Sequence, residues 1–432
     1  MLTTKTRKKI NSHIKNYGDA VDRIFYNKIT LPNGVRIISE EIPTVESFSL
    51  GIFTDVGSRN DPQGKEGLAH FLEHSLFRRT KTRSSRAIAS EFESVGAYTN
   101  AYTTKEHLSF YVRALKPHFR KTFSLLSDLV LNPMFIRKEI EKERQIILEE
   151  IKSYEDDPEE MIFDEADKML FTGHPLGVPI AGYSDTVKDI SCSDLESFHS
   201  HHFMPDNILI ACSGNILFEQ IVNYSTNYFS KLNNNSSLSK TAPLERTNYK
   251  KKELDKPFSQ THLLLARRLP LISSEEKYPL GLLNIILGDG MSSRLNHQVR
   301  ERHGLAYNVE SSFQLLTDCG GFYIYAAMER KFCQKTEKLI HNQMLKLIES
   351  DITATELNRS KEQLKSSTVM AMESMSNRMQ SLAKSELMLH RYEDISSTID
   401  MIDSISLDEI KSTAEKYLNP SDWVTVVFFP EE

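Results

Sequence analysis

The chain has 432 residues, of which 39% are hydrophobic and 26% are charged, and its formal net charge is -6. This length suggests two or more domains, and the composition is that of an ordinary globular protein. The acidic balance, without any basic cluster interleaved with aromatic residues, argues against a nucleic-acid-binding protein. No apolar run reaches the length of about 18 residues that a membrane span requires.

The N-terminus and the cysteines bear on the compartment. Residues 1–20 are rich in lysine but contain no apolar core, so we expect a solvated basic tail rather than a secretory signal or an organelle transit segment. The cysteines show no C-x-x-C spacing, which argues against a cysteine-held metal and suits a reducing, cytoplasmic compartment. They are Cys192, Cys212, Cys319 and Cys333.

Strand and helix signals follow one another through the N-terminal half. Alternating or short apolar runs predict strands, and apolar periodicity near 3.6 predicts helices. The expected strands are 34–38, 47–53, 98–104 and 107–115, and the expected helices are 66–77, 85–95, 118–131 and 136–154.

A polar segment divides the chain, and the two parts resemble each other. Residues 233–256 are rich in Asn, Ser and Lys and predict a linker between domains at 21–232 and 257–432. Ser193-Asp-Leu-Glu196 returns as Ser406-Leu-Asp-Glu409, and Glu139-Ile140 returns as Glu356-Leu357, at offsets of 213 and 217 residues. We therefore predict an α+β fold of two homologous domains, each with a mainly antiparallel sheet packed by helices.

One pentapeptide of the first domain has the spacing of a metal site. In His70-Phe-Leu-Glu73-His74 the two imidazoles fall on one helix face, four residues apart. Neutral histidines are preferred zinc ligands, and the order His-x-x-Glu-His defines the inverzincins. The same shift of about 215 residues leads to 284–290, which holds no His and no Glu. A metal site is therefore expected in the N-terminal domain only.

A catalytic zinc site usually takes a third protein ligand from another element. The acidic helix at 139–151 is the best supply, because Glu143 and Glu150 both lie close to its apolar stripe. Spacing alone does not choose between these two glutamates.

Several segments together resemble the pitrilysin family of zinc metallopeptidases, and most of all its branch of mitochondrial processing peptidases (the beta-like subunit) and bacterial relatives. The matching segments occur in the family's order along the chain. They are Gly67–Phe77, Gly96–Thr103, Glu143–Ile151, Gly173–Gly177, Gly288–Leu295 and Val299–Tyr307.

The resemblance implies one Zn²⁺ per chain, held by His70, His74 and Glu150. It makes Glu73 the general base that takes a proton from zinc-bound water, and Glu143 a carboxylate that orients a ligand.

The resemblance also implies contributions from the second domain. Arg300 would fix the substrate and Tyr307 would stabilise the oxyanion. Arg302 is an alternative to Arg300, because both precede Gly304 closely.

Substrate contacts are implied as well. Asn100 and Ala101 would lie on an edge strand that aligns an extended peptide by strand addition. Phe77 resembles a pocket residue for the side chain after the cut. Glu160 and Asp164, one helical turn apart, would recognise arginine just before the cut.

A second histidine cluster, His199-Ser-His201-His202, is read as helix surface rather than as a further metal site.

These patterns predict a zinc-dependent endopeptidase (a metalloprotease, EC 3.4.24-type) that hydrolyses extended or unstructured peptides. In the resembling branch four such domains close as a clamshell. We expect a homodimer, with an inactive homologous subunit as the other candidate partner. Two other functions stay open: a non-catalytic core subunit of a larger complex, and a maturase that trims one dedicated peptide.

Overall fold

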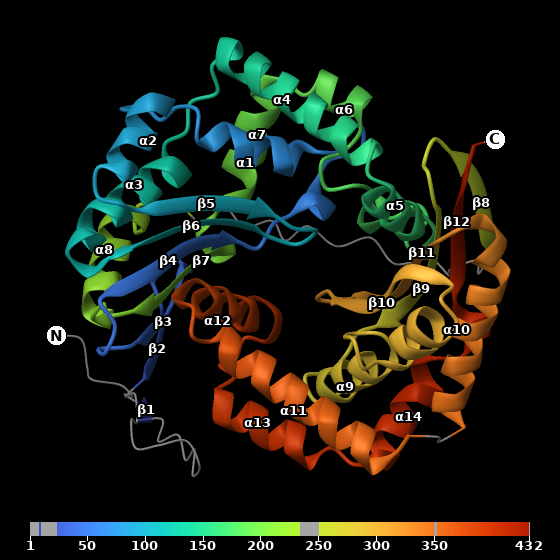
Figure 1. Ribbon diagram of the computed structural model, residues 1–432. Coiled ribbons are helices and arrows are strands. Elements are labelled where there is room, and N and C mark those ends of the chain that lie inside the picture. Colours follow the sequence, from blue (N-terminus) through green and yellow to red (C-terminus); the bar gives the residue numbers. More distant parts are fainter. Residues whose placement is uncertain (1–7, 10–23, 234–249, 350–351, 432) are drawn as a thin grey trace. The chain divides into compact units, whose positions relative to one another are not determined.

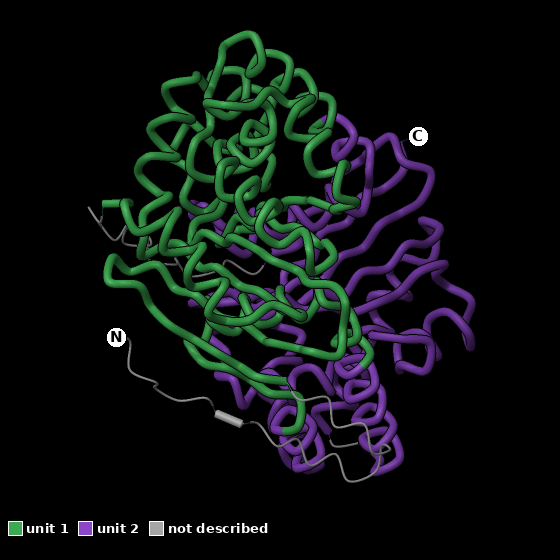
Figure 2. Tube along the Cα trace, turned by 90° about the vertical axis from the view of Figure 1, so that its left-hand side faces the viewer, with its two compact units in different colours: residues 1–151, 179–241, 370–396 green, residues 152–178, 242–369, 397–432 purple. Residues whose placement is uncertain are grey.

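The computed structural model describes residues 8–9, 24–233, 250–349 and 352–431. The chain divides into two units (Figure 2). Unit 1 comprises residues 1–151, 179–241 and 370–396, and unit 2 comprises residues 152–178, 242–369 and 397–432. Each half of the sequence therefore contributes a segment to both units.

Unit 1 is built on a sheet with the strand order β1-β2-β3-β7-β4-β6-β5, in which only β3 and β7 run parallel. Its strands are β1 (Lys8–Lys9), β2 (Phe25–Thr30), β3 (Arg36–Glu41), β4 (Ser47–Thr54), β5 (Tyr98–Thr103), β6 (Leu108–Leu115) and β7 (Ile208–Gly214). Its helices are η1 (Ser58–Asn60), α1 (Leu68–Leu76), α2 (Ser85–Glu93), η2 (Lys116–His118), α3 (Phe119–Leu131), α4 (Arg137–Glu155, in this unit up to Ile151), α6 (Ser184–Asp189), α7 (Cys192–His202), η4 (Pro205–Asn207), α8 (Phe218–Phe229) and α12 (Met375–Leu389).

Unit 2 holds a sheet with the order β10-β11-β9-β12-β8, in which only β12 and β8 run parallel. Its strands are β8 (Lys251–Lys256), β9 (Thr261–Pro270), β10 (Ala306–Leu315), β11 (Cys319–Met328) and β12 (Val424–Pro430). Its helices are α5 (Pro158–Leu170), η3 (Pro175–Gly177), α9 (Lys277–Leu287), η5 (Asn296–Arg302), η6 (Arg330–Phe332), α10 (Cys333–Ile348), α11 (Ala354–Ala371, in this unit up to Val369), α13 (Ile395–Ser404, in this unit from Ser397), α14 (Leu407–Tyr417) and η7 (Pro420–Asp422).

The two sheets are copies of one another. Strands β3-β7-β4-β6-β5 and β8-β12-β9-β11-β10 follow in the same order, with the parallel pair at the same place. The helices match too: α4 and α11 begin 217 residues apart, and so do α5 and α12. The predicted duplication, α+β class and mainly antiparallel sheets are confirmed.

Both faces of the unit 1 sheet are covered, because its inner strands are apolar on both sides. In β7, Ile208 and Ile210 join the core under α1, α3, α7 and α8, whereas Leu209 and Ala211 face α12. Figure 1 shows α12 on the side of this sheet opposite to α1 and α3. The lone helix α12 comes from the C-terminal half of the sequence.

Unit 2 mirrors this arrangement with a helix from the N-terminal half. Leu263 and Leu265 of β9 face α9, α10 and α14, whereas Leu264 and Ala266 pack against α5. The helices α5 and α12 are thus exchanged between the two copies.

Two of the expected boundaries differ from the structure. The linker expected at 233–256 is too long, because Lys251–Lys256 form β8 and pair in parallel with β12. The domains expected at 21–232 and 257–432 do not anticipate the exchanged segments 152–178 and 370–396. The rest of the linker, 234–249, and nearly all of the tail 1–20 lie outside the described residues.

None of the helices among the described residues combines the length and the apolar character that crossing a membrane would need.

Candidate metal centre

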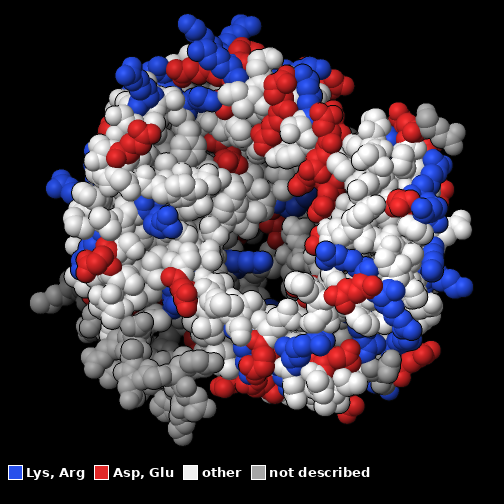
Figure 3. Space-filling view, viewed as in Figure 1, with Lys and Arg blue, Asp and Glu red and all other residues white. Residues whose placement is uncertain are grey.

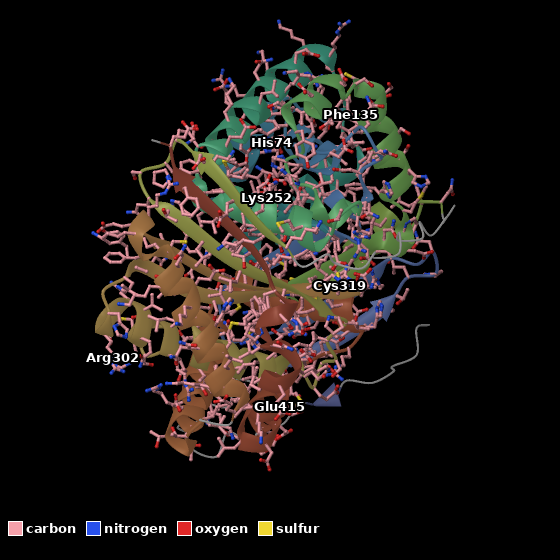
Figure 4. The ribbon with its side chains drawn as sticks, turned by 90° about the vertical axis from the view of Figure 1, so that its right-hand side faces the viewer. His74, Phe135, Lys252, Arg302, Cys319 and Glu415 are labelled. Atoms are coloured by element: carbon pink, nitrogen blue, oxygen red, sulfur yellow. The ribbon has the colours of Figure 1, made fainter. Side chains whose placement is uncertain are left out.

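Helix α1 presents the two histidines of the motif on one face. Its other face carries Leu68, Phe71, Leu72 and Leu76 into the core of unit 1. Because they are four residues apart, His70 and His74 are neighbours on the helix surface, with ring centroids 4.6 Å apart and one ring edge-on to the other. Figure 4 labels His74 among the helices of unit 1.

The start of α1 is fixed by two features that sequence reasoning missed. Gly67 has φ +93° and lies so close to the Ala181 carbonyl that a Cβ would clash with it. The carboxylate of Asp61 accepts the N–H groups of Gly67 and Ala69 at 2.8 Å, which satisfies donors at the helix N-terminus. Gly67 and Asp61 therefore fix the start of α1 and with it the positions of His70 and His74.

Helix α4 supplies the glutamates. Ile140, Ile147 and Ile151 anchor it in the core, and Glu143 and Glu150 lie seven residues apart on nearly the same face. Arg144 joins α4 to its neighbours. Its guanidinium donates to the main-chain carbonyls of Val187 and Ile190 and lies over the Phe71 ring.

Three donors converge at the centre. The Nε2 atoms of His70 and His74 lie 3.8 and 3.6 Å from the two carboxylate oxygens of Glu150. Ligand atoms from all three residues lie within 4.8 Å of one another, and no other such group occurs in the described part of the chain. Two imidazoles and one carboxylate are a donor set that suits zinc and leaves a fourth position open. The residues therefore fit the metal that the sequence predicts.

This geometry favours Glu150 over Glu143 as the third metal ligand, a choice that the sequence spacing left open. Glu150 lies at the Nε2 atoms, whereas Glu143 lies behind His74, with its Oε1 3.1 Å from Nδ1. Glu143 is only 3% exposed, and its other oxygen pairs with the guanidinium of Arg78. A carboxylate at Nδ1 keeps the proton there and leaves Nε2 free to bind a metal.

Burial tunes the protonation of this centre. Burial and the neighbouring His74 lower the pKa of His70 to about 4, against the opposing effect of Glu150. The neutral ring that a metal needs is thereby favoured at neutral pH.

Glu73 sits beside the donors with its own partner. Thr103, the last residue of β5, donates its hydroxyl to Glu73 Oε2 at 2.6 Å. Burial raises the pKa of the Glu73 carboxyl, although the Thr103 hydrogen bond opposes this shift. A raised pKa suits a group that takes up and returns a proton. Sequence reasoning gave Thr103 no role, because its partner is 30 residues away.

The expected peptide-binding residues of unit 1 lie on β5 and at the end of α1. β5 is the edge strand of its sheet, and Asn100 is exposed on it. The N–H of Ala101 donates to Asn100 Oδ1 at 2.9 Å. Phe77 is partly buried and packs against the core, with its ring 6.3 Å from that of Phe110.

The other expected site residues lie in unit 2. Arg300 and Arg302 are exposed on η5, and Arg302 points outward from the surface in Figure 4. Tyr307 is 62% exposed on the edge strand β10. Glu160 is exposed and Asp164 partly buried on α5, and acidic side chains gather where α5 begins (Figure 3). Their roles stay predictions.

The second histidine cluster has structural contacts. The His199 ring bonds the Val130 carbonyl through Nε2 at 2.8 Å, and His202 packs on Phe198 with centroids 4.3 Å apart. Neither belongs to a group of possible metal ligands within the described residues.

The corresponding region of unit 2 keeps an ion pair found beside the site in unit 1, but it lacks the metal ligands. Arg79 pairs with Glu139 in unit 1 at 3.0 Å, and Arg294 pairs with Glu356 in unit 2 at 2.9 Å, at nearly the same offset. Yet α9, the counterpart of α1, contains no histidine and no carboxylate.

Comparisons with known proteins bear on this asymmetry. The model of the insulinase family (peptidase family M16) matches residues 36–184, and the model of the peptidase M16 inactive domain matches residues 189–364. An uncharacterized zinc protease of Bacillus subtilis, YmxG, is 32% identical over 93% of this chain and 98% of its own length. The chain belongs to the M16 family of peptidases. The resemblance to the pitrilysin family is confirmed at this level, whereas the processing-peptidase branch stays a prediction.

Further proteins are similar to this chain in sequence or in fold. An uncharacterized zinc protease of Rickettsia felis is 32% identical, over 90% of this chain and 94% of its own. The crystal structure of a protease from Helicobacter pylori has a TM-score of 0.89 at 21% identity, covering 94% of this chain and 99% of the other. A structure titled as a peptidase M16 inactive domain, from Pseudomonas fluorescens, has a TM-score of 0.87 at 22% identity, covering 94% and 98%. The likeness of these structures shows the M16 fold.

Proposed function

We propose that this M16 protein is a zinc-dependent endopeptidase that hydrolyses extended or unstructured peptides. One observation carries the proposal: His70, His74 and Glu150 converge with their ligand atoms within 4.8 Å, and Glu73 lies one residue from His74. The relatives named as zinc proteases support the choice of metal.

A zinc ion held by these three residues, one per chain, would polarise the scissile carbonyl and make water a better nucleophile at neutral pH. Glu73 takes the proton from the attacking water and returns it to the leaving nitrogen. Glu143 acts through His74, because its carboxylate at Nδ1 fixes the tautomer and the ring orientation.

The peptide is proposed to add to the edge strand β5. Main-chain hydrogen bonds at Asn100 and Ala101 hold an extended substrate with little demand on its sequence. The Asn100 side chain, which accepts the Ala101 N–H at 2.9 Å, has to turn away for that N–H to reach a substrate carbonyl. Phe77 would border the side chain after the cut.

Unit 2 is proposed to supply further substrate contacts. Arg300 is exposed, with no ion pair to another described residue, and Tyr307 is exposed by 62% on an edge strand. Neither side chain is committed to the core, so both are accessible to a substrate. In this proposal Arg300 holds the peptide backbone and Tyr307 donates a hydrogen bond to the developing oxyanion. Glu160 and Asp164 would recognise a basic side chain before the cut, as in the processing-peptidase branch.

The proposed working form is a cytoplasmic homodimer. A single chain carries both the metal ligands and the Arg300 and Tyr307 segment, so two identical subunits suffice. A homologous inactive subunit is the other partner to be tested, by the mass of the purified assembly.

Glu73→Gln tests the proposal when it is assayed beside wild type on basic, presequence-like peptides. We expect retained zinc and hydrolysis reduced by about 10²–10⁴-fold, because the variant keeps the shape of the side chain and loses the base. Unchanged hydrolysis would refute the assigned mechanism.

The same assay separates the rival functions. A wild-type protein that holds zinc but cleaves no peptide of a mixed library would favour a non-catalytic core subunit. Cleavage of one sequence only would favour a dedicated maturase.

A further inference from the structure

The strand proposed to bind the peptide also touches the proposed base. β5 ends at Thr103, and the Thr103 hydroxyl donates to Glu73 Oε2 at 2.6 Å. No second hydrogen bond to Glu73 is found among the described residues, so the Glu73 Oε1 atom is left available to reactants.

The direction of this contact follows from the pleat of the strand. Thr99, Ala101 and Thr103 share one face of β5, because side chains alternate along a strand. Ala101 packs against the core of unit 1, and β5 lies against α1. This face therefore points toward the helix that carries Glu73, while Asn100 lies on the other face.

We propose that Thr103 is a positioning residue, which holds the Glu73 carboxylate in its working orientation and ties it to the peptide-binding strand. The inference rests on the proposed function. Fixing one carboxylate oxygen restricts the side-chain torsions of Glu73 and leaves the other oxygen directed at the reactants.

Unit 2 provides an internal comparison. Its edge strand β10 carries Ser311, whose hydroxyl donates to Asn284 Oδ1 on α9 at 2.7 Å. Gly288 follows that helix, and a Cβ there would lie 2.5 Å from Ser311 Oγ. The metal-free copy thus keeps an edge-strand hydroxyl against its helix, but the hydroxyl meets an amide and a glycine rather than a carboxylate.

The experiment compares Thr103→Val, Thr103→Ser and the control Thr99→Val. Valine keeps the branched shape that strands favour and removes only the hydroxyl, whereas serine keeps the hydroxyl. Thr99 lies on the same face of β5 and donates to the Tyr111 carbonyl at 3.1 Å, so Thr99→Val removes a hydroxyl bond away from Glu73.

We expect Thr103→Val to lower kcat by about 10–100-fold with KM changed less than about 2-fold, and Thr103→Ser to restore most of the loss. Zinc content, melting temperature and peptide binding, the last measured in a Glu73→Gln background, should match those of Thr99→Val. In that background Thr103→Val should reduce hydrolysis no further.

Three results would overturn the inference: an equal loss in Thr103→Ser, a change in KM or peptide binding alone, or a loss of zinc or melting temperature beyond that of Thr99→Val. Unchanged activity in Thr103→Val, with Glu73→Gln inactive, would also overturn it and leave the proposed function standing. Full activity in Glu73→Gln would instead remove the proposed function itself.

Discussion

The guanidinium of Arg378 donates to the carboxylate of Glu40 at 2.9 Å, and both side chains are only 8% exposed. The pair joins the exchanged helix α12 to β3 across 338 residues of sequence. Tyr392 donates to the other oxygen of Glu40 at 2.9 Å. An apolar face and a buried ion pair thus hold α12 on the unit 1 sheet.

Removing one member of this pair should destabilise unit 1. Arg378→Met leaves the Glu40 charge buried without its cation, which typically costs about 3–5 kcal/mol. The double variant Glu40→Gln/Arg378→Met should recover much of the loss, since no buried charge remains. Urea unfolding of the variants measures both effects, and a single variant as stable as wild type would show that the pair does not hold α12.

Glu143 is expected to govern zinc affinity. Glu143→Gln weakens the acceptor at His74 Nδ1, and we expect zinc affinity to fall by about 10–100-fold. Glu149→Gln, on the exposed side of the same helix, is the control and should bind zinc like wild type. Competition with a chromogenic chelator measures the affinities, and equal values for the two variants would contradict the assigned role.

Two partly buried histidines, His107 and His202, should make the stability of unit 1 sensitive to acid. Burial lowers the pKa of each ring to about 4. The nearby charge of Lys384 adds to this shift at His107, and the charge of His201 adds to it at His202. The folded state therefore favours the neutral ring, and this stabilisation is complete above the ordinary pKa of about 6.5. It is lost as the pH falls from 6.5 toward 4.

The melting temperature of metal-free protein should accordingly fall over this pH window, and less steeply in His107→Gln. The control His303→Gln changes an exposed ring of unit 2 and should follow wild type. Equal slopes in all three proteins would count against the assignment.

The local part of the fold could be predicted from the sequence. The expected helix at 85–95 and strand at 107–115 agree with α2 and β6, because their apolar periodicity is set within one element. β8 was missed, since its sequence Lys-Lys-Glu-Leu-Asp-Lys lacks apolar alternation and its order comes from pairing with β12.

What depends on distant partners could not be predicted. The pattern of α5 or α12 indicates an amphipathic helix but not which sheet covers it, so the exchange became visible only in the structure. Glu143 and Glu150 looked equivalent as ligands because seven residues return a side chain to nearly the same helix face. The packing of α4 against α1 distinguishes the two glutamates in the structure. It also pairs Arg78 with Glu143, a contact that the sequence did not indicate.

Zinc content tests the central claim most directly. Protein purified without added metal should contain about one zinc per chain, as a site with three protein ligands implies. The His74→Gln variant should contain far less zinc. Its melting temperature should equal that of wild type when both proteins are measured after removal of metal. Wild-type protein with less than about half a zinc per chain, or with a content unchanged by His74→Gln, would contradict the assignment of His70, His74 and Glu150 as the metal centre.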